Sequence, residues 1–178
     1  MHATRSSPLD LEVGGEINGV PAGSTRYLTR GDLLALTQTN SYVSDDPNFA
    51  NTVQIGGVPL EELAKRLARV GDSPLVVAIC DDLYRAHYSR AYMSAHHPIL
   101  VLTINNAGPE EWPKDSQDPA MGSGPFLISH AKFAPSFRVL SYPDERQIPW
   151  GCCGSSFETR ERYLARSRHV GLRPMTKP

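Results

Sequence analysis

Two short apolar runs rich in β-branched residues lie near the middle of the chain, at residues 75–80 and 99–104. Each is bounded by polar residues or proline, a pattern that favours buried strands over helices. The segment between them is polar and contains two acids, two arginines, three tyrosines and three histidines. The pattern predicts a two-strand core that presents a polar connector at one end, with a short helix or turn over residues 90–95.

The clearest helical pattern begins near Pro59, which suits a first turn, and is expected to end at Gly71. Its apolar positions follow the i, i+3, i+4, i+7 spacing of one helix face: Leu60, Leu63, Ala64 and Leu67. A shorter helix is expected after Thr29, a good N-cap residue with Asp32 at the capping-box position. The residues of this helix that are predicted to face inward are Leu33, Leu34 and Leu36.

Weaker patterns complete the chain. Strands are expected at residues 11–17 (an edge strand), 38–44, 52–55, 124–129, 136–140 and 147–150. Gly56-Gly57 is expected to end the third of these strands. Residues 1–10 are predicted to be a disordered leader. Residues 105–124 are an expected loop of about twenty residues, in which Trp112 plugs a cleft or meets a partner.

Composition narrows the class of protein. The 178 residues suffice for one domain whose core needs no disulfide. The net charge of -1, from 18 basic and 19 acidic residues, argues against a nucleic-acid-binding surface. The 15 prolines and 14 glycines indicate a loop-rich, strand-containing protein rather than a helical bundle. No apolar stretch approaches the roughly 18 residues that span a membrane, and the N-terminus has no apolar core typical of a signal peptide.

Five motifs follow one another along the chain. They are Leu28-Thr29-Arg30-Gly31-Asp32-Leu33-Leu34, Gly57-Val58-Pro59-Leu60-Glu61-Glu62-Leu63, Asp82-Leu83-Tyr84-Arg85, a strand ending at Asn105, and Gly124-Pro125-Phe126-Leu127. In this order they resemble the molybdopterin-binding domain of the sulfite oxidase family. The resemblance implies an α+β fold of mixed β-sheets with short peripheral helices, whose C-terminal part is incomplete in this chain. It also implies molybdopterin as the cofactor.

Four further stretches carry a closer resemblance: residues 79–85 (Ile-Cys-Asp-Asp-Leu-Tyr-Arg), 96–98 (His-His-Pro), 136–138 (Ser-Phe-Arg) and 147–151 (Gln-Ile-Pro-Trp-Gly). They are similar to a bacterial subgroup of that family whose members are usually joined to a C-terminal c-type cytochrome domain. The resemblance implies a c-type cytochrome domain or protein as electron-transfer partner. It places haem c only in the missing C-terminal domain and implies a periplasmic location.

This chain departs from the family pattern at the residue that would bind the metal. Catalytic members of the family bind molybdenum through a cysteine thiolate in the interval that corresponds to residues 37–56, which here contains no cysteine. Molybdenum prefers a soft sulfur ligand, so Ser44, Asp45 or Asp46 would make a chemically different site. Cys80 is the weak alternative ligand, although its apolar run favours a buried small hydrophobe.

Three functions therefore stay open. The first is a degenerate, redox-associated module. The second is an active molybdopterin-dependent oxidoreductase with a non-standard ligand. The third is a small-molecule-binding module with a cleft beneath the loop of residues 105–124.

From Cys152 onwards the strand-like pattern gives way to an arginine-rich sequence, so the predicted domain spans residues 11–151 and an atypical tail spans residues 152–178. Cys152 and Cys153 are adjacent, a spacing that disfavours a bond between them. Permitted codons for residues 152–169, read one frame over, give Leu-Arg-Ile-Glu-Phe-Arg-Asp-Ala-Gly-Thr-Val-Phe-Gly-Ala-Ile-Ala-Pro-Arg, which is a strand, a turn and a second strand. This predicts a frameshift near Gly151. The alternative is a natural basic helix over residues 158–168, and the coding DNA distinguishes the two.

Candidate site residues come mainly from the polar connector. Asp81, Asp82 and Tyr84 follow a strand end and are the candidates for catalysis, with a solvated turn as the alternative. The candidates for binding a pterin phosphate are basic, with ordinary surface charge as the alternative: Arg85, His87, Arg90, His130, Lys132 and Arg138.

Two more patterns lie in or near the same connector. The candidates for a metal or haem-facing cluster are His87, His96 and His97. His96 and His97 would point to opposite sides of an extended chain, which favours structural roles for them. Tyr84, Tyr88 and Tyr92 recur every four residues, which predicts one helical face or a packed rim.

Overall fold

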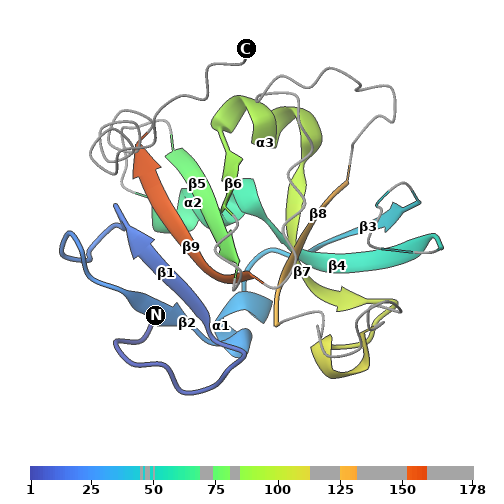
Figure 1. Cartoon of the computed structure of the whole chain (residues 1–178), viewed down its shortest axis with the longest axis horizontal. Coiled ribbons are helices and arrows are strands. Elements are labelled where there is room, and N and C mark those ends of the chain that lie inside the picture. The colour runs from blue at the N-terminus through green and yellow to red at the C-terminus, as the bar shows by residue number, and fades with distance from the viewer. Residues whose placement is uncertain are drawn as a thin grey trace, which may run out of the picture.

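The computed structural model describes residues 1–44, 46, 49, 51–68, 74–80, 85–112, 125–131 and 152–159, with Pro74 and residues 152–159 described by their backbone alone. These residues form two β-sheets and three short α-helices (Figure 1). In spatial order, one sheet holds β2 (Arg26–Leu28), β1 (Leu11–Gly15), β9 (Cys152–Thr159), β5 (Pro74–Cys80) and β6 (Arg85–Tyr88). The other holds β3 (Thr39–Val43), β4 (Val53–Pro59), β7 (Pro98–Ile104) and β8 (Leu127–His130). The helices are α1 (Arg30–Leu34), α2 (Leu60–Leu67) and α3 (Arg90–His96), with a 3-10 turn, η1 (Pro109–Glu111). This arrangement confirms the predicted α+β class.

The four-stranded sheet is antiparallel throughout, and β4 pairs with both β3 and β7. The prediction that Gly56-Gly57 ends this strand is wrong, because β4 continues to Pro59 across a β-bulge. A Cβ atom on Gly57 would collide with the backbone carbonyl oxygen of Leu100. The glycine therefore permits the close approach of two backbones inside the sheet, rather than a turn.

The five-stranded sheet differs more from the predictions. Its central strand is β9, which pairs parallel with β1 and antiparallel with β5. The segment assigned to an atypical tail thus supplies an interior strand, and β1, predicted at an edge, has a neighbour on each side. The two apolar runs predicted as one two-strand core, β5 and β7, lie in different sheets. The connector between them contains β6, whose four residues show too short an alternation to have been predicted.

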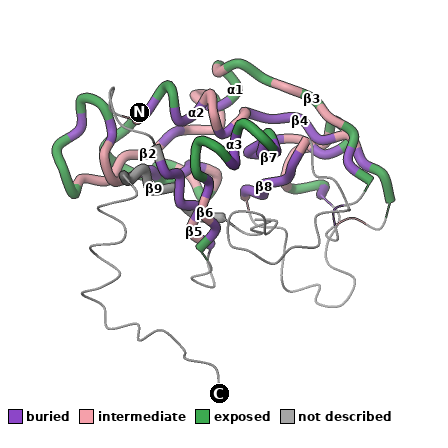
Figure 2. Tube along the Cα trace, turned by 90° about the horizontal axis from the view of Figure 1, so that it is seen from above, coloured by how far each residue is buried: buried purple, intermediate pink, exposed green. Residues whose placement is uncertain are grey.

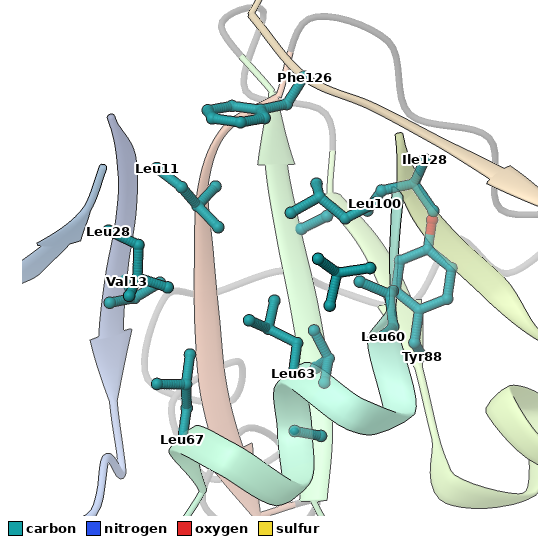
Figure 3. Packing of buried hydrophobic residues seen from close by; sticks show 14 of the residues in the cluster. Leu11, Val13, Leu28, Leu60, Leu63, Leu67, Tyr88, Leu100, Phe126 and Ile128 are labelled. Atoms are coloured by element: carbon teal, nitrogen blue, oxygen red, sulfur yellow. The ribbon is translucent and has the colours of Figure 1, made fainter. Parts of the chain in front are cut away.

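Helix α2 links the two sheets through one apolar cluster. Its predicted inward face is confirmed, since Leu60, Leu63, Ala64 and Leu67 are all buried. Figure 3 shows these leucines among the side chains of both sheets, including Leu100. Full burial of one leucine contributes about 1.5–3 kcal/mol. This face of α2 is therefore a principal contact between the sheets.

The end of α2 was predicted at Gly71, but the helix ends at Leu67. The backbone N–H of Asn18 donates to the carbonyl oxygen of Leu67 at 2.8 Å, and Ile17 forms a β-bridge with Ala68. These contacts from a distant segment turn the chain into an extended conformation at Ala68, which no local signal predicts. Gly71 itself lies outside the described residues.

The capping box predicted for α1 is confirmed. The side chain of Thr29 accepts a hydrogen bond from the backbone of Asp32 at 3.0 Å, and the Asp32 carboxylate accepts one from the backbone of Thr29 at 3.1 Å. Leu33 is buried, whereas Leu34 is 48% exposed. The inward orientation predicted for Leu34 is wrong because a helix of five residues turns only one narrow face toward the core.

Residues 1–10 make specific contacts in place of the predicted disorder. The backbones of His2 and Tyr27 exchange hydrogen bonds at 2.8 and 2.9 Å, and the His2 ring lies 3.1 Å from the Asp32 carboxylate. Backbone hydrogen bonds to β2 and a side-chain contact with Asp32 of α1 thus hold this segment in place. The domain boundaries proposed at residues 11 and 151 stay predictions.

Burial is dense along β4, β7 and β8, while the edge strand β3 is more exposed (Figure 2). The predicted strands at residues 136–140 and 147–150 lie outside the described residues. Of the predicted loop at 105–124, the described part begins with a tight turn in which Asn105 and Asn106 have positive φ angles of 50° and 66°. Within the described ranges, no helix has the length and apolar character needed to cross a bilayer.

Candidate functional site

A buried cluster of tyrosine and histidine side chains lies where β6, α3 and β8 meet. The Tyr92 hydroxyl and the His130 Nε2 are 3.0 Å apart and share a hydrogen bond. The His96 ring packs 4.6 Å from the Tyr92 ring, and Tyr88 meets Tyr92 edge to face at 5.7 Å. The exposed fractions are 0% for Tyr88, 4% for Tyr92 and 2% for His130. The Tyr–His cluster, defined as these four residues, is therefore shielded from water.

Local backbone features fix the positions of this cluster. Ser89 caps α3 by accepting a hydrogen bond from the backbone of Tyr92 at 3.2 Å. At the other end of α3, His97 adopts a left-handed conformation, with φ 46° and ψ 59°, and the chain turns directly into β7. The backbone N–H of Ala131 donates to the His97 carbonyl at 3.2 Å, and His130 pairs with Pro98 across the sheet. These bonds bring His130 against the side chain of Tyr92.

The Tyr92–His130 pair is suited to proton exchange. A neutral imidazole has one donor and one acceptor nitrogen, so the direction of the hydrogen bond depends on the tautomer of His130. In a buried setting such a bond is electrostatically stronger than in water. The pair can therefore hold a proton between two defined atoms, and the rings of Tyr88 and His96, which contact the Tyr92 ring, restrict its motion.

A second buried polar contact lies on the other face of β8. The Ser129 hydroxyl donates to the Asp46 carboxylate at 2.6 Å, and both side chains are buried. Asp46 was one of the residues considered as a replacement metal ligand. Its contact with Ser129 gives it a structural role, which is to fasten the segment after β3 to β8.

The sequence-predicted site residues divide between described and undescribed parts of the chain. The candidates outside the described residues are Asp81, Asp82, Tyr84, Lys132 and Arg138, together with Asp45. Arg85 and Arg90 are exposed, whereas His130 is buried in the Tyr–His cluster. The described basic residues therefore do not line one surface, and their role in phosphate binding stays a prediction.

The three histidines of the connector do not gather. His96 belongs to the Tyr–His cluster and His97 is exposed at the turn after α3. His87 precedes Tyr88 on β6 and so faces the opposite side of the sheet. Burial is the main cause that lowers the pKa of His87, and the nearby Arg85 charge lowers it further, so its ring is neutral near pH 7. Across the part of the chain that the structure describes, no three metal-ligating side chains come together.

Cys80 and Trp112 have the burial expected of core residues. Cys80 is 2% exposed and lies in the apolar cluster that contains α2. Trp112 is 3% exposed, donates its ring N–H to the Ala107 carbonyl at 3.0 Å and packs in a second cluster with residues such as Leu127. Trp112 thus fills space beside the four-stranded sheet instead of meeting a partner.

Molybdenum bound through a thiolate does not fit the described residues. The described part of the interval 37–56 includes β3 and the first part of β4, and the interval contains no cysteine, while Cys80 ends a strand of the other sheet. A small polar patch lies beside Gly56 of β4: the side-chain oxygens of Asn40 on β3 and Thr103 on β7 lie 2.6 and 2.5 Å from the position that a Cβ atom on Gly56 would take. Such oxygens can hydrogen-bond a polar ligand but are poor ligands for a soft metal.

No local pattern pairs the partners of the two buried contacts of β8. Tyr92 and His130 are 38 residues apart, and Asp46 and Ser129 are 83 residues apart. The useful signal was the alternation along residues 127–130, which sends His130 and Ser129 to opposite faces. A histidine and a serine next to buried apolar residues imply that each has a polar partner on its own face.

Comparisons with known proteins give structural similarities to solved proteins. No family model matches the chain, and no curated protein matches it. A similar solved structure is the sulfane dehydrogenase SoxCD from Paracoccus pantotrophus, with 13% sequence identity and a TM-score of 0.49. The match covers 89% of this chain and 40% of that chain, so this chain spans less than half of its length. The identity is too low to transfer any residue role.

Proposed function

We propose that this chain is a sulfite oxidase-type domain that has lost molybdenum oxo-transfer and serves as a redox-associated module for a c-type cytochrome. The motif resemblance supports the fold assignment, and the α+β architecture of two sheets with short helices is compatible with it. A periplasmic setting and a cytochrome partner follow from the same resemblance and belong to the proposal.

One observation carries the loss of oxo-transfer. The segment from which the resemblance would take the metal-binding thiolate forms β3 and β4 without any cysteine. Cys80, the thiol nearest to it in sequence, is 2% exposed inside an apolar cluster. A soft metal would need an accessible sulfur atom, and neither place supplies one.

Metal analysis tests this part of the proposal. The chain is produced in cells that make molybdopterin, and molybdenum and pterin are measured per purified chain. We expect molybdenum far below one atom per chain. One atom per chain would overturn the proposal, and its loss in Cys80→Ser or Asp45→Asn would then identify the ligand of an active enzyme. Cys153→Ser is the matched thiol control.

A second candidate function is a small-molecule-binding module, which the polar patch on β4 favours. Pterin retained without molybdenum, and released in Thr103→Val, would support this candidate over the first. Thr103→Val keeps the side-chain shape and removes the hydroxyl oxygen that lies over Gly56.

Cytochrome binding tests the partner. Calorimetric titration with a c-type cytochrome is expected to show a weak complex that salt weakens further, as is typical of electron-transfer encounters. Absence of any complex at low ionic strength would contradict the cytochrome part of the proposal and leave the metal result unaffected.

A further inference from the structure

The sheet register brings all three cysteines of the chain to one place. Cys80 ends β5, and its Cα partner on β9 is Cys152. The preceding pair joins Ile79 to Gly154, so the register shifts here and Cys153 is the additional residue of a β-bulge. No other cysteine occurs in the sequence. Cys80 and Cys152 are 72 positions apart in sequence. The pairing of β5 with β9 therefore makes them neighbours.

The backbone spacing of such a pair suits a disulfide. Directly opposed residues of antiparallel strands have Cα atoms about 4.5–5.5 Å apart. Disulfides join Cα atoms about 4.4–6.8 Å apart, so the two ranges overlap. Cys152 and Cys153, by contrast, are consecutive, and a bond between them is strained. The register thus favours Cys80 with Cys152 over the other pairs.

We propose that Cys80 and Cys152 form an oxidation-sensitive pair that closes to a disulfide across β5 and β9. The oxidant is a low-molecular-weight disulfide, such as glutathione disulfide. The Cys152 thiolate attacks it and releases one small thiol, and the buried Cys80 thiolate then attacks the Cys152 sulfur of the mixed disulfide and releases the other. The two protein thiols are oxidised, the small disulfide is reduced to two thiols, and the two cysteine protons end on those thiols.

The bond has a structural consequence. β9 lies between β1 and β5, and the two ends of the proposed link lie far apart in sequence. Cross-linking such distant residues restricts the unfolded chain, so the oxidised protein is expected to unfold at a higher temperature than the reduced protein. This inference goes beyond the proposed function and needs no molybdenum or cytochrome.

The test uses the full chain in its folded state. Reduced protein is incubated with glutathione disulfide, and intact mass and peptide mapping without reductant locate the product. We expect loss of two hydrogen atoms, a link between the peptides that contain Cys80 and Cys152, and a raised melting temperature. Cys153→Ser is the matched control, because it removes the bulge cysteine and should retain both the link and the melting shift. Cys152→Ser should lose both.

Three results would overturn the proposal. The first is an equal yield of the link in Cys152→Ser, which would assign it to Cys153. The second is a Cys152–Cys153 product in the wild-type chain. The third is the absence of any link in the folded protein while urea-unfolded protein forms links under the same conditions. Mapping of the wild-type chain decides the matter even where a variant fails to fold.

Discussion

β7 and β9 each lie between two neighbouring strands, yet their sequences differ greatly. β7 reads Pro-Ile-Leu-Val-Leu-Thr-Ile, and all of its residues except Thr103 are buried. β9 reads Cys-Cys-Gly-Ser-Ser-Phe-Glu-Thr, with a glycine and two serines at its centre. The pattern of β7 predicts a strand almost to the residue, whereas the pattern of β9 predicts none.

The difference shows two ways of making an interior strand. In the four-stranded sheet, β7 supplies side chains to both apolar clusters, such as Leu100 to one and Val101 to the other. In the five-stranded sheet, the neighbours of β9 contribute buried apolar residues such as Val13 of β1 and Val76 of β5. Strand preference depends strongly on such context. β9 pairs through its backbone with both β1 and β5, and no local signal in its own sequence predicts this.

The largest effect is expected in the four-stranded sheet, on substituting Gly57→Ala. The added methyl group would collide with the Leu100 carbonyl oxygen and lie 3.0 Å from the Cα of Val101. Backbone atoms cannot rotate away, so β4 and β7 must separate at the bulge. The free energy of unfolding, measured by urea denaturation, should fall by roughly 3 kcal/mol or more.

Gly14→Ala is the control for this substitution. It lies on β1, and a Cβ atom there would meet nothing within 4 Å. Its effect should stay below about 1 kcal/mol. Equal effects of the two substitutions would show that β4 and β7 do not approach as closely as the structure indicates.

A smaller effect is expected in the five-stranded sheet, on substituting Ser155→Pro. Ser155 pairs with Val13 on one side and Ala78 on the other, so its N–H points to one of these strands. Proline has no N–H and leaves one acceptor of the sheet unsatisfied. The expected loss is about 1–3 kcal/mol in the same urea measurement.

Ser155→Thr is the matched control, because it keeps the N–H and favours strands. It should leave the free energy of unfolding nearly unchanged. If Ser155→Pro were equally harmless, β9 would not be an interior strand, and the proposed Cys80–Cys152 pair would lose its basis.

Sequence patterns correctly predicted the features that depend on residues close together in the sequence. The burial of α2 followed from the spacing of Leu60, Leu63 and Leu67, and the start of α1 followed from Thr29 and Asp32. Most of the wrong predictions depend on distant partners. The end of α2 is set by Asn18, and the placement of β5 and β7 in separate sheets is set by pairing across the whole chain.

The candidate site shows the same limit. Sequence patterns identified His96 and His130 as candidates and showed the regular spacing of Tyr88 and Tyr92. They predicted separate roles for these residues. These side chains form one cluster only because β8 pairs with β7. That pairing places His130 next to Tyr92, which lies 38 residues away in sequence. Register between strands is not encoded in the spacing of either segment, and so the cluster was not predicted.

The smallest expected effect concerns Asp10, the residue before β1, and its dependence on pH. One carboxylate oxygen accepts hydrogen bonds from the hydroxyl and backbone of Ser6, both at 2.7 Å, and from the backbone of Ser7 at 2.9 Å. The Ser6 hydroxyl is the main cause that lowers the pKa of Asp10. A lowered pKa in the folded state stabilises the protein above the ordinary aspartate pKa of about 3.9, and this contribution is lost as pH falls through the folded value.

Asp10→Asn should therefore lower the melting temperature near neutral pH and have a diminishing effect below about pH 4. The measurement is the melting temperature of both proteins across this range, with Glu12→Gln as the control at an exposed carboxylate of β1. If the difference in melting temperature between the two proteins stayed constant at low pH, Asp10 would act through the shape of its side chain rather than through its charge. A difference confined to higher pH would show that β1, one of the two strands that hold β9 in place, is itself anchored by a charged group just outside the sheet.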